Sequence, residues 1–230
     1  MKTPWHDKKG KYGEQGMGIE RRNKLVVWSG GRDSTLLLTE TAYEFSTEKY
    51  SIIAYSFVMD FLNDNKIKAE RKARDNYLKW ARKAGYNIEH REISVSFSKN
   101  PLDQGWAQGL SWFSFIVPFI PNNSDVYFGY VQGDGIWLAV NRFHDAYYYL
   151  KFIGDKKDTM IHFPYAIKKK WEIIAGLQNY GVPEDCVWTC EVPIKRKNKI
   201  LPCGKCNPCK TLQVAKFQLK LENKLNQEKK

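Results

Sequence analysis

Residues 25–38 read LVVWSGGRDSTLLL, and this stretch decides the fold of the chain. The apolar run before the glycines predicts a buried strand, and the leucine-rich run after them predicts a helix. Gly30 and Gly31 have no Cβ atom, so their backbone can bend sharply and approach a ligand closely. The helix begins directly after the turn, so its unpaired N–H groups and the positive end of its dipole point at one place. The sequence therefore predicts a phosphate-binding loop.

The polar residues of this loop indicate which kind of phosphate site it forms. Ser34 and Thr35 supply hydroxyl donors where the helix begins. The Gly-Lys-Ser/Thr ending of a Walker loop is not present. An ordinary glycine turn with a Ser or Thr cap is the alternative, and the combination of strand, SGGRDS and helix disfavours it. We expect a pyrophosphate site formed by consecutive residues, namely Trp28, Ser29, Gly30, Gly31, Arg32, Asp33, Ser34 and Thr35.

Strand and helix patterns alternate along the chain. Apolar runs predict further strands at residues 52–57, 88–95 and 126–130, and a helical period predicts a helix at residues 66–84. This alternation predicts an α/β fold with a doubly wound parallel sheet, in which ligands bind beyond the carboxyl ends of the strands. The glycine turn lies at such an end. Phe57 lies at another, and we expect the backbone there to hold an adenine ring.

Cysteines near the C-terminus predict a metal site. Cys203, Cys206 and Cys209 form a C-x2-C-x2-C run, and Cys190 precedes them. Thiolates at this spacing can close on one tetrahedral Zn²⁺, with Cys190 as the fourth ligand. No signal peptide is visible, so a reducing cytoplasm is expected and disulfides are disfavoured. An iron–sulfur cluster stays open as an alternative, and spacing alone does not exclude Cys186 as the fourth ligand.

Composition limits the classes of protein to consider. The 230 residues are 43% hydrophobic and 14% aromatic, which suits a folded α/β domain with a small appendage and excludes a disordered chain. The longest apolar run, residues 113–120, is interrupted by Ser114 and Pro118, so no membrane span is expected. Residues 106–119 are rich in aromatics, and we interpret them as a buried helix or interface rather than a base-stacking surface.

The formal charge of +12 raises the question of nucleic-acid binding. Basic residues are spread over the N-terminal tail, residues 168–170, residues 195–197 and a helix predicted at residues 211–225. No aromatic-interleaved recognition motif accompanies them. We therefore interpret most of the lysine charge as solvated surface, and nucleic acid is not the favoured partner.

Three regions are predicted along the chain. Residues 1–23 are polar and rich in glycine, which is typical of a flexible arm. Residues 24–182 form the predicted nucleotide-binding α/β domain. Residues 183–230 form the predicted zinc-binding region and C-terminal helix.

The loop motif resembles that of the PP-loop, or N-type ATP pyrophosphatase, superfamily. Members of this superfamily bind ATP and cleave it between the α and β phosphates. They adenylate a carbonyl or carboxylate oxygen, and a nitrogen or sulfur nucleophile then displaces AMP. The resemblance therefore implies an adenine nucleotide alpha hydrolase-like fold and an AMP-forming reaction.

The loop and the cysteine run together resemble the 7-cyano-7-deazaguanine synthases over residues 24–215. Shorter features occur in the same order as in that family. They are Ala69-Glu70 with Ala73-Arg74, Phe128-Gly129, Asp134 with Arg142, Pro164 with Lys170-Trp171-Glu172, and Thr189-Cys190.

This resemblance implies a reaction and roles for residues. ATP activates the carboxylate of 7-carboxy-7-deazaguanine, ammonia displaces AMP, and a second ATP dehydrates the amide to the nitrile. Mg²⁺ bridges the phosphates and Zn²⁺ is structural. Ser34 and Lys170 act on the phosphates, and Arg142 recognises the substrate. A homodimer in the cytoplasm is expected.

The chain also departs from the family. The family's second phosphate motif contains Arg-Asn, whereas residues 104–107 here read QGWA. Val140 occupies an acidic position of the family, and Asp64-Asn65 replace its Gly-Gln. These changes favour a diverged relative. Two alternatives stay open: an enzyme of phage biology or anti-phage defence that makes an amide or attaches a deazaguanine to a macromolecule, and a non-catalytic nucleotide-binding subunit.

Overall fold

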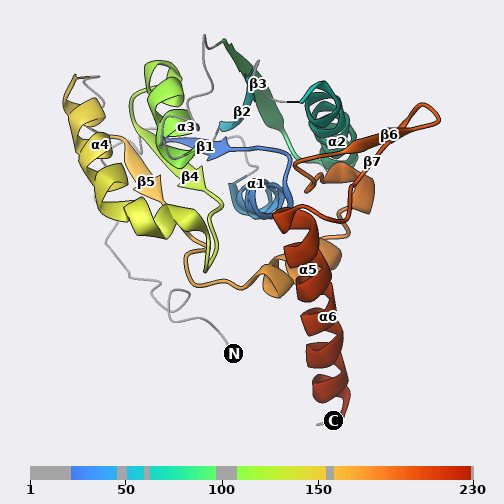
Figure 1. The fold of residues 1–230 in the computed structure, drawn as a ribbon. Helices are drawn as coiled ribbons and strands as arrows, with labels where there is room; N and C mark the ends of the chain where they lie inside the picture. Colours follow the sequence, from blue (N-terminus) through green and yellow to red (C-terminus); the bar gives the residue numbers. More distant parts are fainter. Residues whose placement is uncertain (1–21, 46–50, 60–62, 97–107, 154–157, 229–230) are drawn as a thin grey trace.

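The computed structural model describes residues 22–45, 51–59, 63–96, 108–153 and 158–228. Its centre is a parallel sheet of five strands in the order β3-β2-β1-β4-β5 (Figure 1). The strands are β1 (Asn23–Val27), β2 (Ile52–Met59), β3 (Ile88–Val95), β4 (Ser124–Phe128) and β5 (Met160–His162). Since β2 and β3 lie on one side of β1, and β4 and β5 on the other, the strand order reverses between β1 and β4.

Helices cover both faces of the sheet. The helices are α1 (Arg32–Phe45), α2 (Asp64–Lys83), α3 (Gln108–Ile116), α4 (Val140–Ile153), α5 (Lys170–Asn179) and α6 (Asn207–Glu228). The described residues also form the 3₁₀ helices η2 (Val117–Phe119), η3 (Gly135–Ala139) and η4 (Glu184–Cys186). A separate hairpin of β6 (Ile194–Arg196) and β7 (Lys199–Leu201) projects beside α2 in Figure 1. Within the described ranges, every helix is too short or too polar to span a bilayer.

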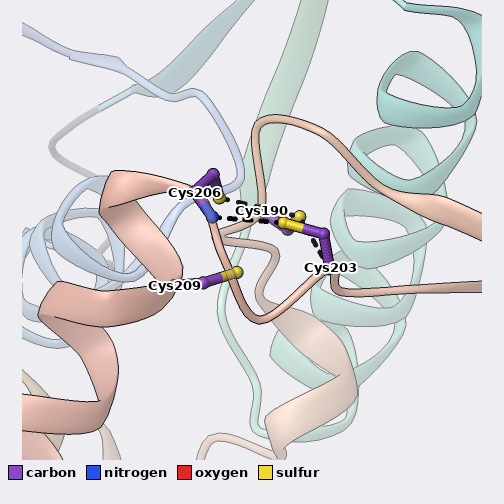
Figure 2. Close-up of side chains that lie close together, drawn as sticks. All are labelled: Cys190, Cys203, Cys206 and Cys209. Atoms are coloured by element: carbon purple, nitrogen blue, oxygen red, sulfur yellow. Dashed lines mark hydrogen bonds between the residues drawn. The ribbon is translucent and has the colours of Figure 1, made fainter.

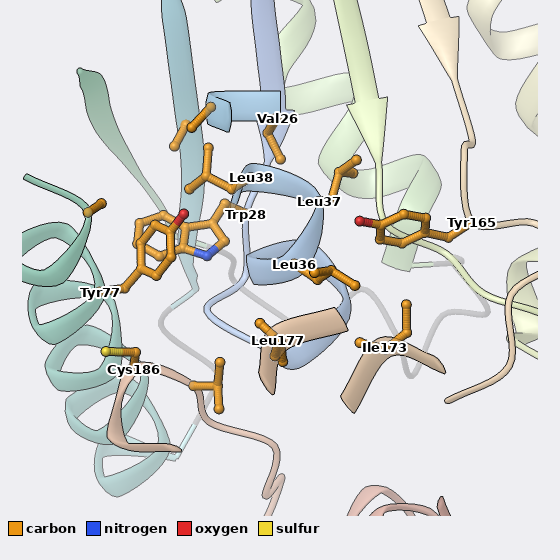
Figure 3. Close-up of a cluster of buried hydrophobic side chains, with 14 of the residues drawn as sticks. Val26, Trp28, Leu36, Leu37, Leu38, Tyr77, Tyr165, Ile173, Leu177 and Cys186 are labelled. Atoms are coloured by element: carbon orange, nitrogen blue, oxygen red, sulfur yellow. The ribbon is translucent and has the colours of Figure 1, made fainter. Parts of the chain in front are cut away.

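The central strand shows how the sequence builds two cores. Val26 and Trp28 pack with α1, α2 and α5 on one face (Figure 3). Leu25 and Val27 pack with α3 and α4 on the other face. This alternation is the period of two of a strand, and here both sets are apolar because helices cover both faces. The doubly wound parallel sheet predicted from the sequence is confirmed.

The boundaries of the elements differ from the sequence predictions by a few residues. The strand expected at 126–130 spans Ser124–Phe128, and the helix expected at 211–225 begins at Asn207. Strand β5 was not predicted, because three residues show no usable alternation. Helix α6 packs against α5 and then continues beyond the body of the domain (Figure 1). The proposed boundary at residue 183 stays a prediction.

Some sequence predictions lie outside the described residues. They concern the arm at residues 1–21, residues 104–107 and the Val140 side chain.

Candidate functional site

A pocket of about 850 Å³ lies at the carboxyl ends of the central strands. The loop after β1 and the turn after β4 both line it, so it lies where the strand order reverses. This is the place where doubly wound sheets bind their ligands. The remaining walls come from the end of β2, from α3, from Lys170 at the start of α5, and from residues around the cysteines.

The glycine loop is held in shape by its own hydrogen bonds. The Ser29 and Ser34 hydroxyls lie 3.0 Å apart, and the Gly31 N–H donates to the Ser29 Oγ over 3.1 Å. Gly30 has φ of 84°, a left-handed conformation that side chains rarely adopt, and its carbonyl accepts the Trp188 N–H. Hydrogen bonds within the protein therefore hold the loop in this bent conformation.

A second glycine brings β4 against this loop. A Cβ atom on Gly129 would lie 3.0 Å from the Ser34 backbone nitrogen. Only glycine allows the turn after β4 to approach the first turn of α1 so closely. The sequence motif Phe128-Gly129 thus completes the pocket at the point where the two strands diverge.

Lys170 lies between two carboxylates at the edge of the loop. Its Nζ is 2.6 Å from the Asp33 carboxylate and 3.4 Å from that of Asp134. Burial lowers the pKa of Lys170, but the two carboxylates outweigh it and the pKa is raised overall. Burial raises the pKa of Asp33, whose Oδ1 atom has no hydrogen-bond partner within the described residues. The loop thus carries a persistent cation and carboxylate oxygens that can accept further bonds.

The structure brings most of the predicted site residues to the pocket. Those that line it are Trp28, Ser29, Gly31, Arg32, Asp33, Ser34, Phe57 and Lys170. Gly30 and Thr35 lie behind the lining, and the Thr35 hydroxyl accepts the Trp28 indole N–H over 2.9 Å. Arg142 is exposed on α4 and does not line the pocket, so the geometry gives no support to its substrate-binding role.

Sequence reasoning missed a buried cation in the pocket wall. The Lys66 ammonium contacts Glu191 and lies 3.7 Å from the Glu70 carboxylate. Burial raises the pKa of Glu70, against the opposing effects of Lys66 and Arg74. Lys66, Glu70 and Glu191 all line the pocket. Glu191 is 125 residues away in the chain, so only the Glu70 motif could have drawn attention to this group.

The predicted cysteine ligands come together in space. The Sγ atoms of Cys190, Cys203, Cys206 and Cys209 all lie within 4.8 Å of one another (Figure 2). The N–H groups of Lys205 and Cys206 lower the pKa of Cys203, which favours the thiolate form that binds metals. This donor set suits a tetrahedral thiolate-binding ion.

Cys186 is not part of this cluster. It is buried in the core beside Tyr77 (Figure 3), and burial together with Asp185 raises its pKa to about 11. A thiol with such a pKa behaves as a packed core residue. The sequence left open that Cys186 could be the fourth ligand, and the structure places Cys190 in that position instead.

The segments that carry the cysteines form one wall of the pocket. Four residues next to its members in the chain line the pocket, namely Thr189, Glu191, Asn207 and Pro208. The Thr189 hydroxyl is buried and has no hydrogen-bond partner among the described residues. A metal ion bound by the cysteines would therefore also hold this wall in position.

Two known proteins resemble most of the chain. 7-Cyano-7-deazaguanine synthase 2 of Rhodopseudomonas palustris (strain HaA2) is 23% identical, over 88% of this chain and 100% of that protein. 7-Cyano-7-deazaguanine synthase of Chloroherpeton thalassium (strain ATCC 35110 / GB-78) is 24% identical, over 80% of this chain and 88% of that protein. No protein-family model matches the chain.

A solved structure is similar at a lower level. The U34-tRNA thiolase NcsA from Methanococcus maripaludis, with its [4Fe-4S] cluster, superimposes with a TM-score of 0.48 at 12% identity. The match covers 89% of this chain and 68% of that one, and it is too weak to carry an argument about this protein. The two synthases belong to the family that the glycine loop and the four-cysteine cluster also resemble. The comparisons and the site together support a diverged relative of the 7-cyano-7-deazaguanine synthases.

Proposed function

We propose that the protein is an ATP-dependent, AMP-forming enzyme that converts 7-carboxy-7-deazaguanine and ammonia into 7-cyano-7-deazaguanine. The observation that carries the proposal is the glycine loop at the pocket of a chain that is similar over most of its length to synthases of this name. The loop offers N–H and hydroxyl donors but no Walker lysine, which suits a leaving pyrophosphate better than a transferred γ-phosphate.

The reaction has two activation steps. A substrate carboxylate oxygen attacks the α-phosphorus of ATP, and the bond to the pyrophosphate breaks. Ammonia then attacks the acyl carbon, AMP leaves, and a proton is lost to give the amide. A second ATP adenylates the amide oxygen, and loss of AMP and a proton gives the nitrile.

The pocket residues act on the charge that develops at the phosphates. Loop N–H groups and the Ser34 hydroxyl donate to the departing pyrophosphate, the kind of stabilisation that electrostatic catalysis requires. Lys170 provides a positive charge at the same edge of the loop. The ammonium has three N–H donors, so it can contact the two carboxylates and also donate to a phosphate.

Two metal ions are part of the proposal. Asp33 and Asp134 supply the carboxylate oxygens that Mg²⁺ prefers, and Mg²⁺ neutralises phosphate charge when it is bound with ATP. Zn²⁺ is the ion proposed for the cysteine cluster. Four thiolates leave no open coordination position, so its role is structural. A cytoplasmic location and a homodimer stay predictions.

Product analysis tests the proposed reaction. The protein is incubated with ATP, Mg²⁺, ammonium and 7-carboxy-7-deazaguanine, and the deazaguanine products are identified by mass spectrometry. We expect the nitrile, with two AMP formed for each nitrile. An unchanged acid would contradict the proposal, and accumulation of the amide alone would show that the second activation is lost. Omission of ATP is the control.

A further inference from the structure

The pocket lining has two parts of different chemistry. One part is polar and contains Ser29, Asp33 and Lys170, and the other is aromatic and contains Phe57, Trp112, Phe128 and Tyr130. Phe57 and Trp112 stack with their rings 6.0 Å apart and 11° from parallel. Phe128 and Tyr130 stack with their rings 6.0 Å apart and 8° from parallel. Flat aromatic walls of this kind accommodate a planar ring.

Two polar atoms in this aromatic wall have no partner. The Trp112 Nε1 and the Tyr130 Oη are both buried, and neither makes a hydrogen bond within the described part of the chain. A buried polar group without a partner destabilises the folded protein, and such groups are rare. Two of them in one wall of a ligand-sized pocket indicate that a ligand supplies the missing partners.

The chemistry of the two atoms restricts that ligand. An indole N–H can only donate, so the ligand must offer an acceptor to Trp112. Burial raises the pKa of Tyr130, which keeps its hydroxyl protonated and available as a second donor. A deazaguanine acid is planar and carries carbonyl and carboxylate oxygens. The adenine ring of ATP is also planar, but its acceptors are neutral ring nitrogens, whereas the acid offers a charged carboxylate that forms stronger hydrogen bonds.

We propose that Trp112 and Tyr130 determine specificity for the planar, oxygen-bearing heteroaromatic substrate by donating hydrogen bonds to it. This inference rests on the proposed function, because that function supplies the second ring beside ATP. It assigns a role to the aromatic segment at residues 106–119 that the sequence interpretation gave to packing alone.

Substitution by phenylalanine tests the proposal at each position. Trp112→Phe and Tyr130→Phe retain an aromatic ring and remove the donor. We expect each to weaken binding of 7-carboxy-7-deazaguanine by on the order of tenfold to a hundredfold, measured by calorimetry. Binding of a non-hydrolysable ATP analogue is expected to change less than about twofold, since the phosphate loop is untouched. The Tm of the ligand-free protein is expected to hold or rise, because an unpartnered polar group is removed.

Tyr147→Phe is the matched control, because its hydroxyl donates to the Thr159 carbonyl away from the pocket. This variant is expected to lower Tm and to leave acid binding unchanged. Three results would overturn the proposal: unchanged acid affinity in both pocket variants, loss of affinity for the ATP analogue instead, or a wild-type protein that binds no acid. Acid binding without AMP formation would overturn only the proposed reaction.

Discussion

The glycine loop and the cysteine cluster are both encoded by short motifs, but they are held together differently. The loop is closed by hydrogen bonds between its own residues, such as the Trp28 indole to the Thr35 hydroxyl. In the cluster, four sulfur atoms from two separate segments lie within 4.8 Å of one another, and thiolates this close repel one another unless a metal ion neutralises their charge. We infer that hydrogen bonds within the protein keep the loop in shape, whereas the cluster depends on its metal.

Removal of a cluster cysteine should give the largest effect. Cys206→Ser is expected to lose the metal and to lower the free energy of unfolding by roughly 5 kcal/mol or more, since structural zinc binding contributes about 10 kcal/mol or more to folding. Metal analysis and denaturant unfolding measure the two effects. Cys186→Ala is the matched control and should retain about one zinc per chain, because its thiol lies in the core. Iron with sulfide in the wild type would contradict the zinc assignment.

A substitution in the loop should abolish activity without affecting the fold. Gly31→Val places a Cβ atom 3.1 Å from the Ser29 Oγ, and the branched side chain displaces that hydroxyl from the loop. Turnover should fall below detection while metal content and Tm stay near wild type. Gly135→Ala is the control. Gly135 lines the same pocket, and a Cβ atom added there would have no other atom within 4 Å. Loss of metal in Gly31→Val would show that the two regions are not separable.

Removal of one loop donor should have a smaller effect. Ser34→Ala takes away a hydroxyl that can be redirected from Ser29 to the pyrophosphate. We expect kcat to fall by on the order of a hundredfold with little change in the KM for the acid, as for other oxyanion donors. Steady-state kinetics measure the changes in kcat and in KM separately. Ser51→Ala, on an exposed residue, should keep full activity, and an unchanged kcat in Ser34→Ala would exclude a role for this hydroxyl in the chemical step.

An ion pair remote from both regions should affect stability alone. The Asp125 carboxylate accepts hydrogen bonds from Arg22 and Lys24, and despite burial its pKa is lowered by Arg22, Lys24 and His162. A lowered pKa gives stability that is present above the unfolded value, about 3.9, and that is lost as the pH falls toward the folded value.

Asp125→Asn should therefore cost about 2 kcal/mol of unfolding free energy at pH 7 and much less at pH 3. Urea unfolding at the two pH values measures the difference. Asp75→Asn, on the exposed surface of α2, should change the unfolding free energy by less than about 0.5 kcal/mol at either pH. An equal cost of Asp125→Asn at both pH values would contradict the assigned pKa direction.

The sequence was enough to predict those parts of the site that are formed by consecutive residues. The strand, turn and helix around Gly30 are contiguous, so the motif predicted them together. The helix α6 begins inside the cysteine run, which the sequence did not predict, although Pro208 is tolerated in the first turn of a helix.

Contacts between distant segments could not be predicted. Lys66 meets Glu191 only after the metal-binding region folds back over α2. The unpartnered atoms of Trp112 and Tyr130 are visible only once the pocket exists, because their residue types are equally typical of a core. Arg142 was assigned from motif spacing, and helix α4 leaves it exposed away from the pocket.

The bond of ATP that is cleaved tests the central claim most directly. Nucleotides are separated by chromatography after reaction with 7-carboxy-7-deazaguanine and ammonium, with Gly31→Val as the inactive control. The glycine loop holds pyrophosphate donors and lacks a Walker lysine, so we predict AMP and pyrophosphate in equal amounts. ADP and phosphate, or no nucleotide turnover in the wild type, would contradict the account.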